Sequence, residues 1–317
     1  MKHFLLPRSL LAVGAVVLVG GFLVSSQAQT ARKPSLQNIP AKRSTALPQP
    51  YAIDVSQAFT DQGQRRTYYL HTPIADSPTH PLPLLVALHG SGMQGKEMAE
   101  KTALNQLADQ VGAVVVYPDG LKQKWNVSGQ APEDNVAFVH TLIEQVQRSR
   151  SIDPQRVYVV GLSNGGILTQ KLACEAPNGI AAIATVAASL PNQFATHCQT
   201  QQPIPLLMVN GTADTIVPWQ GGTSPDVRIG RNLSIPSIPT VVNFWQRHNA
   251  CSPPPKVDQV SNVVEVTDYS SCKDGSEVML AKLEGAGHVW AGGGYGQSAF
   301  GDTTQRVWQF LQRHSLH

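Results

Sequence analysis

The segment Gly161-Leu162-Ser163-Asn164-Gly165 lies between two stretches of different pattern. The apolar run 157–160 precedes it, and a helical pattern follows it over 166–174. A buried strand, a sharp turn with a central serine and a helix form the context in which G-x-S-x-G is typical of a nucleophile elbow. A Cβ at either flanking glycine would clash where such a helix approaches its strand. The segment therefore predicts a strand–turn–helix unit that presents a nucleophilic serine.

Strand-like and helix-like patterns alternate on both sides of this segment. Short apolar runs predict strands, and apolar residues at helical spacing predict helices. The expected strands cover 66–72, 84–88, 113–117, 157–160, 183–187, 206–210, 263–267 and 278–283, and the expected helices cover 98–111, 136–146, 166–174, 241–249 and 307–311. This alternation predicts an α/β fold with a mostly parallel central sheet and helices on both faces. Residues 219–240 contain several Gly, Pro and Ser and are expected to form a long loop.

The start of the chain has the pattern of a secretory signal peptide. Lys2 and Arg8 precede an uncharged apolar stretch at 10–24, and Ser26-Gln27-Ala28 places small residues where a signal peptidase reads them. The apolar stretch has 15 residues, which is fewer than the roughly 18–20 that a membrane-spanning helix needs. We therefore expect a signal peptide at 1–28, with an uncleaved anchor as the alternative. The mature protein is then secreted, extracellular or periplasmic, without stable membrane association.

The rest of the 317-residue chain divides into a linker and one large domain. Residues 29–50 contain four prolines among polar residues, which is typical of a flexible tether. Residues 51–317 are expected to form the catalytic domain, and an apolar content of 42% is sufficient for its core. The net charge is only +3 and the charged residues are scattered, which argues against nucleic acid as a partner.

The chain contains four cysteines, and an even number after a leader suggests two disulfides. Three pairings are possible. We expect neighbours in the sequence to pair, as Cys174–Cys198 and Cys251–Cys272, with buried free thiols as the alternative. A zinc site is disfavoured because no two cysteines have C-x-x-C spacing.

A serine hydroxyl needs a base within hydrogen-bond reach, and the base needs an orienting acid. In open α/β sheets such residues lie on loops beyond the carboxyl ends of the strands. His288 follows the expected strand 278–283 in a glycine-rich loop, and Asp214 follows the expected strand 206–210. We therefore predict Ser163 as nucleophile, His288 as base and Asp214 as acid, in the chain order serine, acid, histidine.

The other histidines after Ser163 are less well placed to act as the base. His248 falls within an expected helix, and His314 and His317 stand at the C-terminus, where fraying is common. Asp214 has its own alternative as an ordinary turn residue, because aspartate favours turns.

Two backbone N–H groups are needed to stabilise the oxyanion of an acyl-transfer intermediate. One is expected at Asn164, directly after the nucleophile, and the other at Ser91, in the glycine-rich loop after the strand 84–88. His89, in the same loop, is expected to brace the loop and not to act as a second base. A glycine-rich turn without a catalytic role is the alternative for this loop.

Three tryptophans stand beside these motifs: Trp125, Trp219 and Trp290. They are predicted to form an aromatic wall for the substrate, with core packing as the alternative. The predicted chemistry requires no metal and no organic cofactor.

Several segments, taken in order, resemble one family. They are Leu88-His89-Gly90, Tyr117-Pro118-Asp119-Gly120, Trp125-Asn126, Asp134 to Phe138, Ile152-Asp153-Pro154, Val157 to Gly166, Leu172-Ala173-Cys174, Asn210 to Pro218 and Gly287-His288-Val289-Trp290. Together they resemble the secreted esterases that include polyhydroxybutyrate depolymerase-like enzymes, feruloyl esterases and acetylxylan esterases (carbohydrate esterase family 1). The resemblance implies the α/β-hydrolase fold and assigns the same three catalytic residues.

The chain departs from the family pattern at three positions. Ala291 replaces a proline, Ser91 stands where relatives often have cysteine or glycine, and Asn135 replaces an aspartate. None of these changes touches the expected triad, so they bear on the shape of the pocket and on the preferred substrate.

These observations lead to one main hypothesis. We expect a secreted serine esterase that cleaves carboxylic esters, either polyhydroxybutyrate-type polyesters and oligomers or feruloyl and acetyl esters of polysaccharides. A serine peptidase of the same fold and a non-catalytic carbohydrate-binding module on a hydrolase scaffold are the alternatives.

Overall fold

The computed structural model describes residues 52–74, 79–127, 134–196, 198, 202–223 and 234–316. The expected signal peptide at 1–28, the linker at 29–50 and His317 lie outside these residues. The described residues all belong to one structural unit, Gln49–His317. None of the helices in these residues combines the length and the apolar character needed to span a bilayer.

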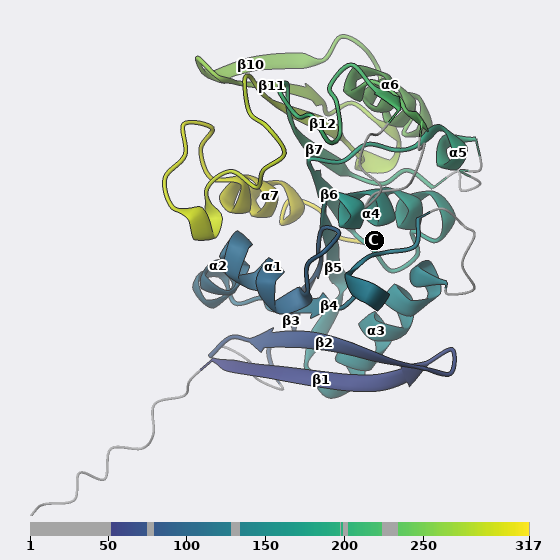
Figure 1. The fold of residues 1–317 in the computed structure, drawn as a ribbon, viewed down its shortest axis with the longest axis vertical. Coiled ribbons are helices and arrows are strands. Elements are labelled where there is room, and N and C mark those ends of the chain that lie inside the picture. Colours follow the sequence, from purple (N-terminus) through teal and green to yellow (C-terminus); the bar gives the residue numbers. More distant parts are fainter. Residues whose placement is uncertain are drawn as a thin grey trace, which may run out of the picture. The chain divides into compact units, whose positions relative to one another are not determined.

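The main β-sheet extends from one end of this unit to the other (Figure 1). Its strands are β1 Ile53–Asp61, β2 Gln64–Thr72, β3 Leu82–Leu88, β4 Val114–Pro118, β5 Ile152–Leu162, β6 Ala182–Val186, β7 Leu206–Gly211, β10 Lys256–Ser261, β11 Val264–Tyr269 and β12 Val278–Leu283. In the described part of the chain their order is β1-β2-β4-β3-β5-β6-β7-β12-β11-β10. The six strands from β4 to β12 in this order pair in parallel, whereas β1, β2, β11 and β10 pair antiparallel at the two ends. A separate short ribbon pairs β8 Gly222–Thr223 with β9 Ser234–Ile235.

Helices cover both faces of the sheet (Figure 1). On one face lie α1 Gly95–Thr102, α2 Leu104–Val111 and α7 Thr303–Leu311, and on the other lie α3 Asn135–Ser149, α4 Asn164–Glu175, α5 Asn192–Ala195 and α6 Ile238–His248. The described residues also contain three short 3₁₀ turns, η1 Leu121–Gln123, η2 Lys273–Gly275 and η3 Gly293–Tyr295. The predicted α/β architecture is therefore confirmed.

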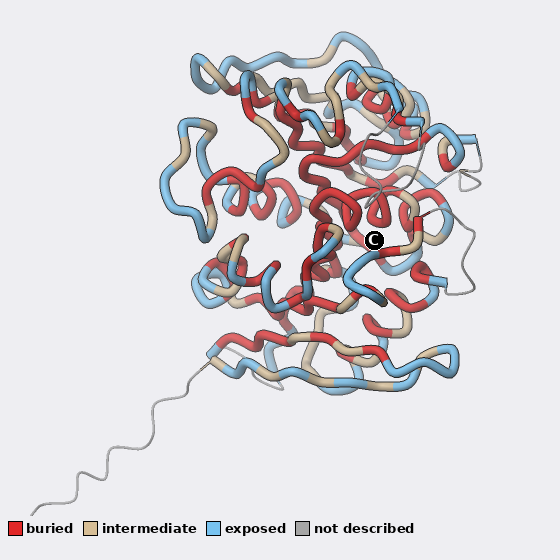
Figure 2. Tube along the Cα trace, viewed as in Figure 1, coloured by how far each residue is buried: buried red, intermediate tan, exposed pale blue. Residues whose placement is uncertain are grey.

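The central strands divide their side chains between two hydrophobic cores. On β5, Val157 and Val159 belong to the core under α3, α4 and α6, whereas Tyr158 and Val160 belong to the core under α1, α2 and α7. This alternation follows from the two-residue period of a strand, whose successive side chains point to opposite faces. Figure 2 shows the consequence: the inner strands are buried, and the outer strands β1 and β10 are largely exposed.

Several elements differ from the sequence-based expectation: α5 was not predicted, and β8 and β9 lie in the segment 219–240 that was expected to be a loop. The single helix expected at 98–111 is two helices, because Ala103 adopts φ 55° and ends α1 with a hydrogen bond from its N–H to the Ala99 carbonyl. Alanine has the highest helix propensity, so the pattern gave no sign of a break there. Strand β10 was not predicted, because all six of its residues are exposed and it lacks an apolar face.

The structure contains two disulfides, Cys174–Cys198 and Cys251–Cys272, which are the pairs expected from the sequence. No described cysteine is free, so the alternative of buried thiols is wrong. Cys174 stands in the last turn of α4, the helix that begins directly after Ser163. The first disulfide therefore ties the far end of that helix to the segment after α5.

Candidate active site

Ser163 occupies the turn between β5 and α4 in a conformation that few residues adopt. Its φ is 54° and its ψ is −117°, which lies outside the regions favoured by residues with a side chain. Glycine neighbours make this turn possible. A Cβ on Gly165 would press against the carbonyl oxygens of Leu88 and His89, and a Cβ on Gly166 would come within 2.5 Å of the Ala188 Cβ. The sequence therefore allows α4 to begin in direct contact with the sheet, with the serine at its start.

The Asp214 carboxylate holds His288 in a defined orientation. One carboxylate oxygen, Oδ1, accepts hydrogen bonds from the backbone N–H groups of Ile216 and Val217, each at 2.8 Å. The other, Oδ2, lies 2.7 Å from His288 Nδ1. The Asp214 side chain is fully buried, whereas the His288 side chain is 19% exposed. Since the carboxylate is an acceptor, this contact assigns the proton to Nδ1 and leaves Nε2 as the acceptor of the ring.

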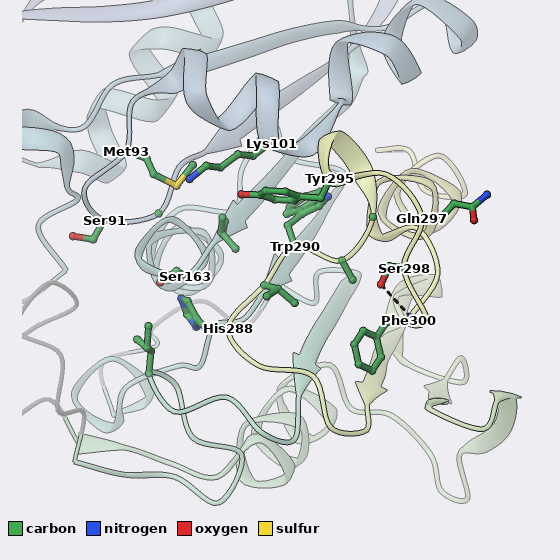
Figure 3. Close-up of a pocket in the computed structure, with 16 residues that line it drawn as sticks. Ser91, Met93, Lys101, Ser163, His288, Trp290, Tyr295, Gln297, Ser298 and Phe300 are labelled. Atoms are coloured by element: carbon green, nitrogen blue, oxygen red, sulfur yellow. Dashed lines mark hydrogen bonds between the residues drawn. The ribbon is translucent and has the colours of Figure 1, made fainter. Parts of the chain in front are cut away.

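Ser163 and His288 line the same cavity, which has a volume of about 500 Å³. Figure 3 shows the His288 imidazole beside Ser163, with the cavity extending from them toward Trp290 and Phe300. Ser163 follows β5, Asp214 follows β7, and His288 follows β12. The structure thus brings the three predicted residues together at the carboxyl ends of parallel strands, where α/β folds place their ligands.

The loop expected to supply the oxyanion donors lies against the nucleophile. A Cβ on Gly90 would be 3.5 Å from the Ser163 Cβ, and Ser91 lines the same cavity. The loop is held by hydrogen bonds from Gly92 N–H to the Gln123 carbonyl and from Met93 N–H to the Gly90 carbonyl. The catalytic role of the Ser91 amide stays a prediction.

Asn164 is the first residue of α4, where backbone N–H groups have no acceptor one turn earlier in the helix. Its side chain binds the backbone of Trp125 twice. Trp125 N–H donates to Asn164 Oδ1 at 2.7 Å, and Asn164 Nδ2 donates to the Trp125 carbonyl at 3.2 Å. These bonds connect the start of α4 with the loop after η1. The oxyanion role of the Asn164 amide is likewise a prediction.

His89 is buried behind the cavity and supports the loop, as the sequence analysis expected. Its Nδ1 donates to the Gly90 carbonyl at 2.7 Å, and its Nε2 accepts from Gly120 N–H at 2.9 Å. The Trp125 indole N–H donates to the His89 carbonyl, and the two rings lie 4.9 Å apart. Burial lowers the pKa of His89, so the ring stays neutral and keeps its Nε2 acceptor.

The three expected tryptophans occupy different positions. Trp290 lines the cavity, and its indole N–H donates to Thr304 Oγ1 at 2.9 Å. Trp125 is 2% exposed and packs in the core, and Trp219 is half-buried; neither belongs to the residues that line this cavity. Core packing, the alternative considered for these residues, describes Trp125. A substrate contact of Trp219 stays a prediction.

Sequence reasoning missed most of the cavity wall. The segment after His288 contributes Val289, Ala291, Tyr295, Gln297, Ser298 and Phe300, and the opposite side contributes Met93 and Lys101. The glycines of 292–296 could have indicated that the segment after His288 packs closely on another element, which in the structure is α1. The signal for the second group was absent, because Lys101 has the spacing of an ordinary solvent-facing helical residue. Among the described residues, no group of three His, Cys, Asp or Glu side chains is arranged to hold a metal ion.

The sequence is similar to those of several esterases. The family model described as Esterase PHB depolymerase matches residues 67–196. The putative esterase NocK from Nocardia uniformis subsp. tsuyamanensis is 30% identical over 254 residues, which cover 73% of this chain and 72% of that protein. Feruloyl esterase B from Piromyces equi is 31% identical over 244 residues, which cover 74% of this chain but only 42% of that longer protein.

The fold is similar to those of solved esterases. The acetyl xylan esterase from Aspergillus awamori superposes with a TM-score of 0.58 at 16% identity, over 74% of this chain and 94% of that one. A CE1 ferulic acid esterase from Anaeromyces mucronatus superposes with a TM-score of 0.53 at 14% identity, over 83% of this chain and 91% of that one. The chain therefore has the α/β-hydrolase fold and belongs to the esterase family described as Esterase PHB depolymerase, a family of carboxylic ester hydrolases.

Proposed function

We propose that this protein is a secreted serine esterase that cleaves carboxylic esters through Ser163, His288 and Asp214. One observation carries the proposal. The buried Asp214 holds His288 Nδ1 at 2.7 Å, which leaves the imidazole Nε2 free to act as a base beside the cavity that Ser163 also lines. A histidine oriented by a buried carboxylate next to a serine in a strained turn is the arrangement that activates a serine hydroxyl.

The reaction proceeds in two stages. Ser163 Oγ attacks the ester carbonyl carbon while His288 Nε2 takes the serine proton, and His288 then gives that proton to the departing alkoxide. The acyl group is now an ester of Ser163. Water attacks this acyl-enzyme after losing a proton to His288, which returns it to Ser163 Oγ as the carboxylic acid leaves. Asp214 stabilises the imidazolium during each stage and itself remains ionised.

The tetrahedral intermediates carry a negative charge on the former carbonyl oxygen. We assign its stabilisation to the backbone N–H groups of Asn164 and Ser91. Support comes from the start of α4 at Asn164, where the helix dipole favours negative charge, and from the position of the 89–93 loop against Ser163. Each such donor contributes on the order of 10²–10³ in kcat in related chemistry.

The cavity suits an ester with a bulky apolar part. Apolar side chains, among them Met93, Leu162 and Ile216, form most of its lining together with Trp290 and Phe300. Similar proteins carry names that refer to feruloyl esters, acetylxylan and poly(3-hydroxybutyrate). We therefore propose feruloyl or acetyl esters of polysaccharides and hydroxybutyrate oligomers as the substrate classes to examine first.

Export from the cytoplasm is proposed on two grounds. The sequence begins with a signal-like segment. The described cysteines form two disulfides, which persist in oxidising compartments such as the extracellular space and the periplasm.

Hydrolysis of 4-nitrophenyl butyrate by the wild type and by Ser163→Ala tests the catalytic assignment. The wild type is expected to release 4-nitrophenol with saturation kinetics, and the variant is expected to lose activity while its Tm remains close to that of the wild type. Equal activity of the two proteins would remove Ser163 from the mechanism. Turnover of 4-nitroanilide peptides but not of esters would instead support the peptidase alternative.

A further inference from the structure

The residues that line the cavity beside Ser163 include a positively charged side chain and no acidic one. Lys101 is the one residue with a permanent charge among the described residues that line it, and none of these residues is an aspartate or a glutamate. The remaining lining consists of glycines, apolar side chains, neutral polar side chains and His288. A ligand in this cavity therefore meets a cation and no competing carboxylate.

The backbone of Lys101 is held firmly in place. It lies in the last turn of α1, where η3 and the glycines around it pack directly on the helix. A Cβ on Gly293 would come within 2.7 Å of the Thr102 carbonyl oxygen and within 3.1 Å of the Lys101 carbonyl oxygen. A Cβ on Gly294 would collide with the Glu100 carbonyl oxygen. Because the loop lies so close, the position of the Lys101 backbone relative to the cavity is fixed.

The Lys101 side chain points into the cavity. Figure 3 shows it extending between Met93 and Tyr295, with its amino group on the side of Met93. The residue is half-buried. Within the described residues no carboxylate forms an ion pair with Lys101, although other lysines, such as Lys171, Lys256 and Lys282, each have one.

Asp214, the acid of the proposed triad, does not neutralise this charge. Asp214 is fully buried behind His288, and its two oxygens already bind His288 and the amides of Ile216 and Val217. A half-buried ammonium group beside an apolar surface, without a counter-ion, interacts more strongly with an anion than an exposed one does. The structure thus offers a binding position for an anionic group at the edge of the reaction site.

We propose that Lys101 selects ester substrates that carry a free carboxylate, which pairs with its ammonium group while Ser163 attacks the ester bond. This inference rests on the proposed esterase function. The carboxylate takes no part in bond making and is unchanged in the products. It can belong to the alcohol side of the ester, as in a linear hydroxy-acid oligomer, or to the acyl side, as in the half ester of a dicarboxylic acid.

The experiment compares charged and neutral substrates in two matched pairs. The first pair is the linear dimer of 3-hydroxybutyrate and the methyl ester of that dimer, in which the carboxylate lies on the alcohol side. The second pair is 4-nitrophenyl hydrogen adipate and 4-nitrophenyl heptanoate, in which it lies on the acyl side. kcat/KM is measured for the wild type, Lys101→Met, which removes the charge at similar length, and Lys101→Arg, which keeps it.

The wild type is expected to prefer the charged member of one pair by ~10-fold in kcat/KM, the scale of one charge-assisted hydrogen bond. Lys101→Met removes that preference because the KM of the charged substrate rises more than that of its neutral counterpart, whereas Lys101→Arg retains the preference. The preference also declines as salt rises from about 0.05 to 0.5 M, because ions screen the pair. The pair that shows the preference identifies the side of the ester bond that faces Lys101.

Two results would overturn the inference: a wild type without preference in either pair, or an equal loss of kcat/KM on charged and neutral substrates in Lys101→Met. Both leave the proposed function standing as long as the wild type cleaves 4-nitrophenyl heptanoate and Ser163→Ala does not. A wild type that cleaves none of the four esters would instead refute the proposed function, and the inference with it.

Discussion

Asn164 and Trp125 are joined by two hydrogen bonds between the side-chain amide of the first and the backbone of the second, at 2.7 and 3.2 Å. Trp125 in turn donates its indole N–H to the His89 carbonyl at 2.9 Å. The residue that follows the nucleophile is therefore connected through Trp125 to the loop that carries Ser91. This connection is one of the contacts that fix the position of the two expected oxyanion donors relative to each other.

Asn164→Ala is expected to separate these two elements. The backbone N–H of residue 164 remains, but the amide that holds Trp125 is lost, so the donors shift relative to the reacting carbonyl. We expect kcat for 4-nitrophenyl butyrate to fall by roughly 10–100-fold with little change in KM, since displacements of about 1 Å have such effects on catalysis. Steady-state kinetics measure kcat and KM separately and so test this expectation. A higher KM at constant kcat would show that Asn164 acts in substrate binding and not in positioning.

Asp214→Asn is expected to leave the fold intact and remove most of the activity. The amide can donate to His288, which favours the tautomer with its proton on Nε2, so that nitrogen no longer accepts the serine proton. A loss of roughly 10⁴-fold in kcat is expected from this change in triads of this type. The same substitution at Asp302, which caps α7 through the amides of Thr304 and Gln305, is the control and should affect stability alone.

Gly165→Ala is expected to destabilise the protein. The new Cβ would meet the backbone carbonyls of Leu88 and His89, which cannot move without disturbing β3. Overpacking of this kind costs about 1–3 kcal/mol in the free energy of unfolding. Gly287→Ala is the matched control for stability, because no atom lies within 4 Å of its added Cβ. Urea denaturation of both variants measures the difference, and similar losses in the two would contradict the close packing described at the elbow.

The stability of the protein is expected to fall in mildly acidic solution, in part because of His89. Burial lowers the pKa of this residue in the folded state. Below a pH of about 6.5, the ordinary value for histidine, the unfolded chain therefore binds a proton that the folded protein excludes. The free energy of unfolding consequently decreases as the pH falls through this range and is unaffected by His89 above it.

His89→Gln removes this titration. We expect its free energy of unfolding to be lower than that of the wild type at pH 7.5, and to decrease less between pH 7.5 and pH 5.5. Urea denaturation at several pH values measures both quantities. An identical pH dependence of the two proteins would show that His89 binds its proton equally well in both states.

The sequence was sufficient to predict the inner strands and the placement of Ser163, Asp214 and His288 in loops that follow them. The central strands are buried apolar runs, and the candidate catalytic residues follow them closely in the chain, as Asp214 follows β7. Patterns within a few consecutive residues are therefore enough to predict these strands and the loops that follow them. The disulfide pairs also matched the expectation, because each joins cysteines that are close in the sequence.

The cavity wall was harder to predict because it depends on contacts between distant segments. Lys101 faces the cavity only because η3 folds back on α1, which is far from it in the sequence. The break at Ala103 has the same character, since nothing in the apolar spacing of 98–111 indicates it. Trp125 was expected to contact substrate from its position beside the motifs of the predicted site, whereas in the structure it is buried and connects His89 with Asn164.

The most direct test of the account is the site of covalent labelling by a fluorophosphonate. Intact-mass and peptide mass spectrometry of the treated protein should find one phosphonyl group per chain, attached to the peptide that contains Ser163. His288→Ala should suppress the labelling, because the serine then lacks its base. A wild type that remains unlabelled, or that carries the group on another residue, would contradict the claim that Ser163 is the nucleophile of an esterase.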